Sequence, residues 1–247
     1  MSPSEGSAAT TIPARAWIEK DRFLVHPGLS AAGLSHGVTT RALGNMKDES
    51  RRREAAAILG AGEPLTLKQV HGTKIFPAAL ANLGQEGDGW TVGPGDEGVC
   101  VAVYVADCVP LYLWSEDGLY AGIFHAGWKG LAAGMATGAV EALAARGAEP
   151  RRLQAALGPH IGVSSYIVGA ELARSFSAQV LPRRSDGLRL DLYAETRRQL
   201  RSAGLAEGSI APAAPCTASH PDLFYSFRRD KQDARMLALL FYKRSPS

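Results

Sequence analysis

Three side chains able to take part in one reaction, His71, Cys108 and His125, stand at or just beyond short apolar runs. Such runs indicate buried strands, and a polar group left unpaired there costs roughly a few kcal/mol. A metal ion would satisfy one thiolate and two imidazoles together, and this donor set suits Zn²⁺ and accepts copper. Three protein ligands leave a fourth position open, as in catalytic zinc sites that activate water or polarise an oxygen. The three residues therefore form a candidate metal site.

The same residues allow other interpretations. Their spacings, 108 − 71 = 37 and 125 − 108 = 17 residues, match no compact zinc module. Spacing alone favours hydrogen-bonded core histidines and an inert buried cysteine. Without a metal, Cys108 is a candidate nucleophile of an amide hydrolase, with His125 or His71 as its base. A structural metal site or an interaction module is a third, non-enzymatic interpretation.

Several cations near these segments form a second candidate group. Guanidinium groups at strand ends or turns beside a metal would bind an anion such as phosphate. Solvated surface charge is the alternative, and it is favoured most for Arg229 and Lys68. The group consists of Arg41, Lys68, Lys129, Arg228 and Arg229.

The elements that must position these residues are three apolar runs, at residues 99–104, 109–114 and 119–124. Their shortness and their Val, Ile and Tyr content predict strands buried on both faces. Cys108 then follows the first of these strands, and His125 ends the third. Two glycines frame Trp128 and indicate a tight turn or a close backbone approach at the site.

The remaining pattern predicts an α/β (mixed α+β) fold, a single domain with a mixed β-sheet core flanked by helices. Residues 82–98 are rich in Gly, Asp and Pro, which predicts a loop. Further strands are expected at residues 16–25, 38–39, 65–70, 73–80, 153–157, 188–190, 210–212 and 224–227. Helices are expected at residues 47–59, 131–146, a segment carrying Leu172, Phe176 and Val180, 191–203 and 230–242.

Composition limits the function classes. The chain has 247 residues, 46% hydrophobic and 21% charged, with a net charge of +3, which gives no nucleic-acid footprint. Residues 1–15 form a Ser-, Ala- and Thr-rich tail without a secretory apolar segment, and no run approaches the ~20 residues that span a bilayer. Residues 16–247 are then one catalytic domain.

Three cysteines indicate no disulfide framework, and we expect a cytoplasmic protein.

Two enzyme classes are excluded by their ligand sets. A multicopper oxidase needs several histidine-rich copper sites, whereas this chain has six histidines and no His-x-His pair. The zinc-deaminase signature H-x-E…P-C-x-x-C is also absent.

A set of motifs, in order along nearly the whole chain, resembles the YfiH family, also called the laccase-domain or "polyphenol oxidase" family. The motifs are His36-Gly-Val-Thr-Thr-Arg41, Lys68-Gln-Val-His-Gly72, Ala106-Asp-Cys-Val-Pro110, His125-Ala-Gly-Trp-Lys-Gly130, Gly158-Pro-His-Ile-Gly162, Tyr166-x-Val-Gly169, Cys216-Thr217 and Phe224-Tyr-Ser-Phe-Arg-Arg-Asp230. The set as a whole is specific to that family.

The resemblance implies a fold related to the catalytic domain of cytotoxic necrotizing factor, and a zinc-type site at the three residues named first. It implies purine nucleoside phosphorylase activity on adenosine, inosine and methylthioadenosine, with adenosine deamination as a side activity. Nucleoside and phosphate are then the partners. Arg41, Asn45 and Arg228 match family positions near the site. Some relatives are described instead as peptidoglycan editing factors with a cysteine nucleophile, and the older laccase label refers to copper-dependent phenol oxidation.

The sequence departs from the family pattern in three places. Only residues 42–44 separate Arg41 from Asn45, where the family has a longer Gly- and Ser-rich loop. Lys129 replaces the usual arginine, and residues 231–235 replace a Gly-x-Thr-Gly-Arg segment. These departures concern the expected substrate range and leave the three metal ligands intact.

Overall fold

Two five-stranded sheets, packed face to face, form the centre of the computed structural model, which describes residues 16–82 and 84–243. The first sheet is antiparallel throughout. Its strands, in spatial order, are β1 (Ile18–Lys20), β2 (Phe23–Val25), β3 (Ser35–Thr39), β13 (Met236–Tyr242) and β6 (Val99–Val105).

The second sheet is mixed, because β4 and β5 run parallel while its other pairs are antiparallel. Its strands, in spatial order, are β4 (Ile75–Pro77), β5 (Gly89–Val92), β8 (Ala121–Ala126), β7 (Val109–Ser115) and β9 (Leu153–Leu157).

Strand β7 shows why the apolar runs lack a polar face. Leu111 and Leu113 pack toward the helices, whereas Tyr112 and Trp114 pack into the core between the sheets. Successive strand side chains point to opposite faces, and here both faces are covered. The Tyr112 hydroxyl lies 3.1 Å from the carbonyl of Gly37 and 3.2 Å from another carbonyl of the first sheet, so it joins the two sheets.

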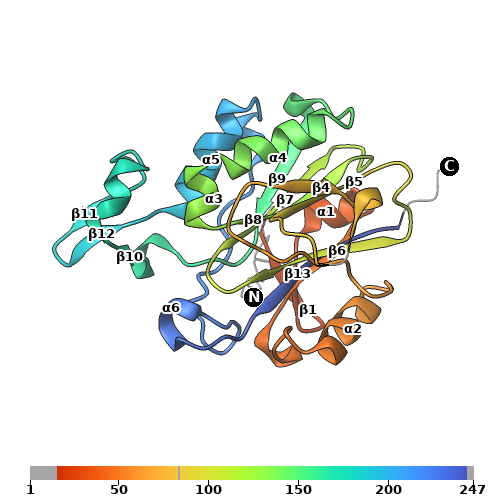
Figure 1. Ribbon diagram of the computed structural model, residues 1–247, viewed down its shortest axis with the longest axis horizontal. Coiled ribbons are helices and arrows are strands. Elements are labelled where there is room, and N and C mark those ends of the chain that lie inside the picture. Colours follow the sequence, from red (N-terminus) through yellow and green to blue (C-terminus); the bar gives the residue numbers. More distant parts are fainter. Residues whose placement is uncertain (1–15, 83, 244–247) are drawn as a thin grey trace, which may run out of the picture.

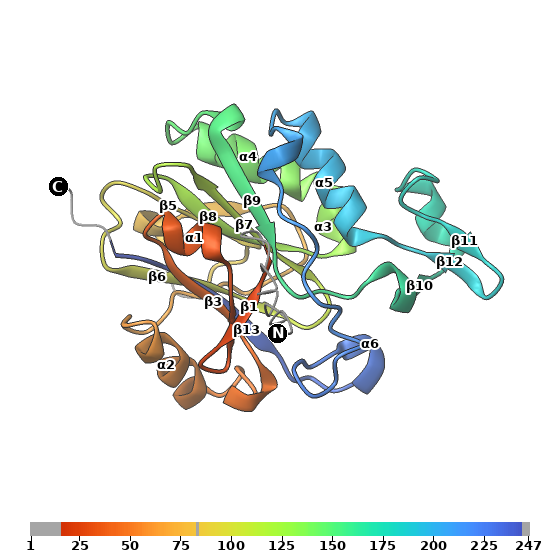
Figure 2. The same cartoon turned by 180° about the vertical axis from the view of Figure 1, so that it is seen from behind.

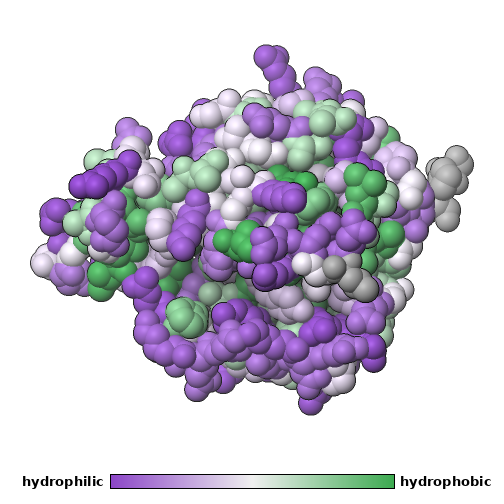
Figure 3. Space-filling view, viewed as in Figure 1, coloured by the Kyte–Doolittle hydropathy of each residue, from purple (hydrophilic) through white to green (hydrophobic). Residues whose placement is uncertain are grey.

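Helices cover the outer faces and give four layers. Both views place α4 and α5 over the second sheet and α2 below the first (Figure 1, Figure 2). The surface over α2 and α6 is mostly hydrophilic (Figure 3). The helices are α1 (Pro27–Ala31), α2 (Glu49–Ile58), α3 (Trp128–Ala132), α4 (Met135–Ala144), α5 (Leu192–Ser202) and α6 (Phe227–Asp230).

A small three-stranded sheet forms an arm beside this body (Figure 1). It consists of β10 (Ile167–Val168), β12 (Gly187–Arg189) and β11 (Arg183–Arg184). Short 3-10 helices connect the larger elements. They are η1 (Arg41–Leu43), η2 (Ala78–Leu80), η3 (Pro150–Arg152), η4 (Val163–Ser165), η5 (Ala170–Arg174) and η6 (Glu207–Ser209).

The mixed α/β prediction is confirmed, as are the three central strands. The predicted helix at 230–242 is wrong, since residues 236–242 form β13, which lies between β3 and β6 in the first sheet. All seven of its residues are buried, and such a run has neither helical nor strand periodicity to distinguish the two.

Several other predicted elements differ from the structure over short segments. The predicted loop at 82–98 contains the buried strand β5. Residues 65–70 make single bridges instead of a strand, and residues 224–227 lead into α6. The helix expected at 131–146 is divided into α3 and α4 at Gly134, whose φ of +89° is unfavourable for other residues. The helix expected around 172–180 is reduced to the 3-10 turn η5.

The predicted tail, residues 1–15, lies outside the described residues. Among the described helices, none has the length and apolar character needed to cross a membrane.

Candidate metal centre

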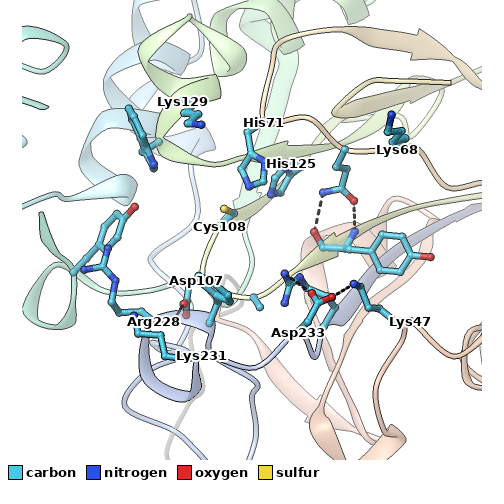
Figure 4. A pocket seen from close by; sticks show the side chains of 17 residues that line it. Lys47, Lys68, His71, Asp107, Cys108, His125, Lys129, Arg228, Lys231 and Asp233 are labelled. Carbon is cyan, nitrogen blue, oxygen red and sulfur yellow. Dashed lines mark hydrogen bonds and ion pairs between the residues drawn. The ribbon is translucent and has the colours of Figure 1, made fainter. Parts of the chain in front are cut away.

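The three residues predicted as ligands lie together. One nitrogen or sulfur atom from each of His71, Cys108 and His125 falls within 4.8 Å of the others. The two imidazole rings are 4.8 Å apart between centroids and nearly perpendicular. Figure 4 shows both rings and the Cys108 sulfur directed toward one common point. No other group of three such side chains occurs in the part of the chain that the structure describes.

Two turns with left-handed backbone and one strand deliver these side chains. Cys108 lies in the turn between β6 and β7, directly after Asp107, whose φ is +91°. His71 lies in a turn and has φ +62° itself. Positive φ is uncommon outside glycine, and such residues concentrate at functional sites. His125 comes from β8 and is 3% exposed, so it forms the rigid side of the group.

The glycines around Trp128 are required by close contacts. A Cβ atom on Gly127 would lie 2.9 Å from the Cys108 sulfur and 3.2 Å from the His71 ring. A Cβ atom on Gly130 would lie 2.9 Å from the carbonyl oxygen of Gly72. The predicted close backbone approach is therefore present: the backbone at the start of α3 packs directly against Cys108 and the His71 turn.

Asp88 is the residue at the site that sequence reasoning missed. It is fully buried directly before β5, and its Oδ1 accepts a hydrogen bond of 2.8 Å from Nδ1 of His125. Its carboxylate also accepts from the backbone N–H groups of Val70 (3.3 Å), His71 (2.9 Å) and Gly72 (2.8 Å). A single acid inside a Gly- and Asp-rich segment gave no signal in the sequence.

Burial and charge act together on the acidities at the site. Burial alone raises the pKa of Cys108, but the charge on His125 and hydrogen bonds from both histidines lower it to about 6. Burial lowers the pKa of His125, but the Cys108 thiolate and Asp88 raise it to about 9. Burial likewise opposes the low pKa of Asp88, which the His125 and Gly72 hydrogen bonds maintain. Without a metal, these shifts favour a thiolate at Cys108 and an imidazolium at His125 at neutral pH, beside the Asp88 carboxylate. A metal ion bound at Nε2 of His125 would take the place of the proton there.

A cavity of about 950 Å³ opens over the candidate ligands. Aromatic side chains and cations make up much of its wall. It is lined by Lys47, Lys68, Gln69, His71, Tyr104, Ala106, Asp107, Cys108, His125, Trp128, Lys129, Tyr166, Phe227, Arg228, Lys231, Asp233 and Arg235.

The predicted cations separate into two groups. Lys68, Lys129 and Arg228 line the cavity, and the Arg228 guanidinium lies 4.8 Å from the centroid of the Tyr166 ring. Arg41 is not among the lining residues, because its guanidinium donates to the Pro221 carbonyl at 2.5 Å.

Arg229 and Asn45 serve the surrounding structure. Arg229 pairs with Asp230 and donates to backbone carbonyls, including that of Phe224 at 2.8 Å. It is therefore not the free surface charge that the sequence suggested. Asn45 also lies off the cavity, and its Oδ1 accepts from the backbone N–H of Arg235 at 3.0 Å.

Asp107 ties the Cys108 turn to the C-terminal part of the chain. Its carboxylate accepts from the Thr217 hydroxyl at 2.6 Å and from the backbone N–H of Arg228 at 2.7 Å. Its own carbonyl accepts from the backbone N–H of Ile161 at 2.9 Å. These bonds hold the residue before Cys108 in its left-handed conformation.

The arrangement fits a metal ion of the zinc type. The donor set is one thiolate and two imidazoles, and Asp88 accepts the Nδ1 proton of His125, which leaves Nε2 for a metal. A carboxylate behind a histidine ligand is the usual way in which proteins fix the ring and its tautomer. His71, Cys108 and His125, which all line the cavity, would hold the ion.

Comparison with known proteins gives one consistent family. A family described as "Multi-copper polyphenol oxidoreductase laccase" matches residues 30–243. The purine nucleoside phosphorylase of Xylella fastidiosa (strain 9a5c) is 34% identical over 203 residues, which is 77% of either chain. That of Deinococcus radiodurans is 36% identical over 199 residues, 78% of this chain and 76% of the relative. The purine nucleoside phosphorylase YfiH of Escherichia coli (strain K12) is 30% identical over 200 residues, 78% and 80% of the two chains.

Solved structures show the same fold. The crystal structure of YlmD from Geobacillus stearothermophilus superimposes with a TM-score of 0.82 at 28% identity, covering 93% of this chain and all of YlmD. A Bacillus licheniformis YfiH protein has a TM-score of 0.81 at 24% identity and covers 91% of this chain and 98% of its own.

Proposed function

The chain belongs to this laccase-domain family of YfiH and YlmD proteins, and from that premise we propose that it is a zinc-dependent purine nucleoside phosphorylase. It would cleave adenosine, inosine and methylthioadenosine with phosphate to give the free base and a ribose 1-phosphate. The observation that carries the proposal is the His71–Cys108–His125 group at the base of a cation-lined cavity of about 950 Å³. The names of the relatives support it.

When bound, the ion would supply Lewis-acid polarisation of an oxygen on phosphate or ribose. His71 and His125 orient toward the same point as the Cys108 thiolate, and Asp88 keeps the Nδ1 proton of His125 away from it. The aromatic part of the cavity wall, which includes Trp128, would cover the purine and exclude water from it.

Charge pairing among the cations that line the cavity supports a proposal for the phosphate position. Three lining cations have carboxylate partners: Lys47 and Arg235 share Asp233, and Lys68 pairs with Glu86.

Three other lining cations, Lys129, Arg228 and Lys231, make no ion pair with a carboxylate among the described residues. Figure 4 places Arg228 and Lys231 together on the side of Cys108 opposite Lys47. A guanidinium without a carboxylate partner suits a phosphate oxyanion best, so we assign phosphate to Arg228, with Lys231 beside it. The Arg228 guanidinium also donates to the Ile167 carbonyl, but unlike Arg41 it lines the cavity. Lys129, on another part of the wall (Figure 4), is the second candidate.

The test combines metal analysis with turnover. Purified protein should contain about one zinc per chain, which Cys108→Ala loses, and should release adenine from adenosine only when phosphate is present. A metal-free protein inactive on nucleosides would refute the proposal.

Substitutions at two arginines would test the proposed phosphate position. Arg228→Met should raise the phosphate KM roughly 10- to 100-fold, because a hydrogen bond to a charged group contributes about 1.5–3 kcal/mol to binding. Arg41→Ala should leave the phosphate KM nearly unchanged, because its guanidinium bonds to Pro221 outside the cavity. Equal effects of the two substitutions would contradict the assignment to Arg228.

Adenosine deamination at the same site is part of the proposal. Inosine formation from adenosine without phosphate, abolished in Cys108→Ala, would support it. Copper-dependent phenol oxidation is the less favoured alternative, since the described residues contain a single group of three such ligands.

One observation favours a second candidate, a cysteine-dependent amide hydrolase of the kind that would edit peptidoglycan precursors. The thiolate of Cys108, the imidazolium of His125 and the carboxylate of Asp88 have the order of a nucleophile, its base and an orienting group. This candidate requires no metal. Full amide hydrolysis by chelator-treated protein would support it over the phosphorylase.

A further inference from the structure

The buried carboxylate of Asp88 is connected to both histidines of the site. It is fully buried and receives one ring N–H from His125 and three backbone N–H groups from residues 70–72. Residues 70–72 and His125 are far apart in the sequence and come from different elements. Asp88 is thus the point at which the His71 turn and strand β8 meet.

The backbone of Asp88 is held as firmly as its side chain. Its N–H donates to the Lys74 carbonyl at 2.9 Å, and its carbonyl accepts from the N–H of His125 at 2.7 Å. The flanking glycines allow this approach, because a Cβ on Gly89 would lie 2.6 Å from the Phe124 ring and one on Gly87 2.8 Å from another aromatic ring. Hence, the carboxylate cannot shift without moving β5.

We propose that Asp88 is a positioning residue that sets the distance between the His71 turn and the His125 ring, and so the geometry of the Cys108 site. His71 is exposed and has φ +62°, and the hydrogen bonds of Asp88 link the backbone of its turn to the His125 ring of β8. The consequence for catalysis rests on the proposed function, whereas the geometric role does not.

The chemistry of asparagine makes Asp88→Asn a sharp test. The carboxylate offers Oδ1 to the His71 N–H and the His125 ring, and Oδ2 to the Val70 and Gly72 N–H groups. An amide has one acceptor oxygen, so in either orientation its NH₂ faces one of these two pairs of donors. Two of the four donors therefore lose their acceptor.

Zinc affinity, measured by competition with a chromophoric chelator, should fall roughly 10- to 100-fold in Asp88→Asn. The Co²⁺-substituted variant should show altered d–d absorption bands. Hydrogen exchange of the backbone amides that face the new NH₂ group should accelerate at least about tenfold, because they lose a protecting hydrogen bond. These are the amides of Val70 and Gly72 in one orientation of the asparagine, and that of His71 in the other.

Asp96→Asn is the matched control. Asp96 is also buried, at 1% exposure, and accepts from the Gly93 N–H at 2.9 Å and from Arg146 at 2.6 Å. Its substitution should lower the stability of the fold while leaving zinc affinity and the exchange of residues 70–72 unchanged. A role of Asp88 in stability alone would make the two variants behave alike.

The outcomes separate the inference from the proposed function. Unchanged zinc affinity together with slow exchange at residues 70–72 in Asp88→Asn would overturn the inference. Wild-type protein that binds no zinc would refute the phosphorylase, and the exchange comparison would still decide the role of Asp88. If Asp88→Asn does not fold, wild-type exchange decides: slow exchange of the His71 and Gly72 amides supports the role, and fast exchange overturns it.

Discussion

Gly127→Ala should disable the site while preserving the fold. The backbone of Gly127, with φ −80° and ψ 170°, is open to alanine, so the substitution adds no backbone strain. The added methyl group would lie 2.9 Å from the Cys108 sulfur and 3.2 Å from Cδ2 of His71. Unstrained non-bonded contacts are about 3.5–4.0 Å, so the sulfur must retreat by roughly 0.6–1.1 Å.

That displacement exceeds what a metal site tolerates. Ligand distances in such sites hold to about ±0.2 Å, so we expect Gly127→Ala to lower zinc affinity and phosphorolysis by at least tenfold. Overpacking of this kind costs about 1–3 kcal/mol of unfolding free energy, which a domain can survive. Chelator competition, turnover and denaturant unfolding measure the three quantities.

Gly138→Ala supplies the matched control. Gly138 lies inside α4 and has no atom within 4 Å of its added Cβ. Alanine there should raise stability by about 0.5–1 kcal/mol and leave zinc affinity unchanged. Wild-type zinc affinity in Gly127→Ala would refute the argument, because it would mean that Cys108 and His71 can move without losing the metal.

Two further predictions concern acidity. Buried His36 donates from Nδ1 to the Leu34 carbonyl and accepts the His26 N–H at Nε2, and burial lowers its pKa to about 4, so the unfolded chain binds more protons. His36 should therefore cost about 3 kcal/mol of unfolding free energy as the pH falls from 6.5 to 4. His36→Gln should remove that part of the pH dependence in denaturant unfolding and leave the smaller part that comes from His160, whose pKa burial also lowers. In metal-free protein at pH 7, iodoacetamide should modify Cys108, whose pKa is about 6, long before Cys100, whose pKa burial raises to about 12. Mass spectrometry measures the order of modification, and the reverse order would contradict the assigned acidities.

The candidate ligands could be predicted because their chemistry marks them individually. Cys108 and His125 are polar residues at the ends of apolar strands, and the turn glycines beside them leave a recognisable motif. Asp88 carries no such mark, since an acid among glycines is the ordinary composition of a loop. Its function depends on contacts with residues 70–72 and His125, which only the fold brings together.

The fold was predictable where amphipathic or short apolar patterns determine the element. Residues 49–58 and 192–202 are helices close to their expected positions, with Asp48 and Asp191 capping their N-termini. Residues 236–242 were misassigned because a strand covered on both faces loses its alternation. Arg41 was placed at the site by its motif, whereas its side chain turns to Pro221.

The position of β13 has a consequence for synthesis of the protein. This strand follows all the other described strands along the chain, yet it lies between β3 and β6 in the first sheet. Until it is translated, β6 lacks the partner that pairs with it along its whole length, and the turn carrying Cys108 continues directly from β6. Sheets built from distant segments form slowly, because the long loop must close first. A nascent chain on the ribosome should therefore expose an incomplete sheet edge and acquire its thiolate site only after β13 has left the ribosome.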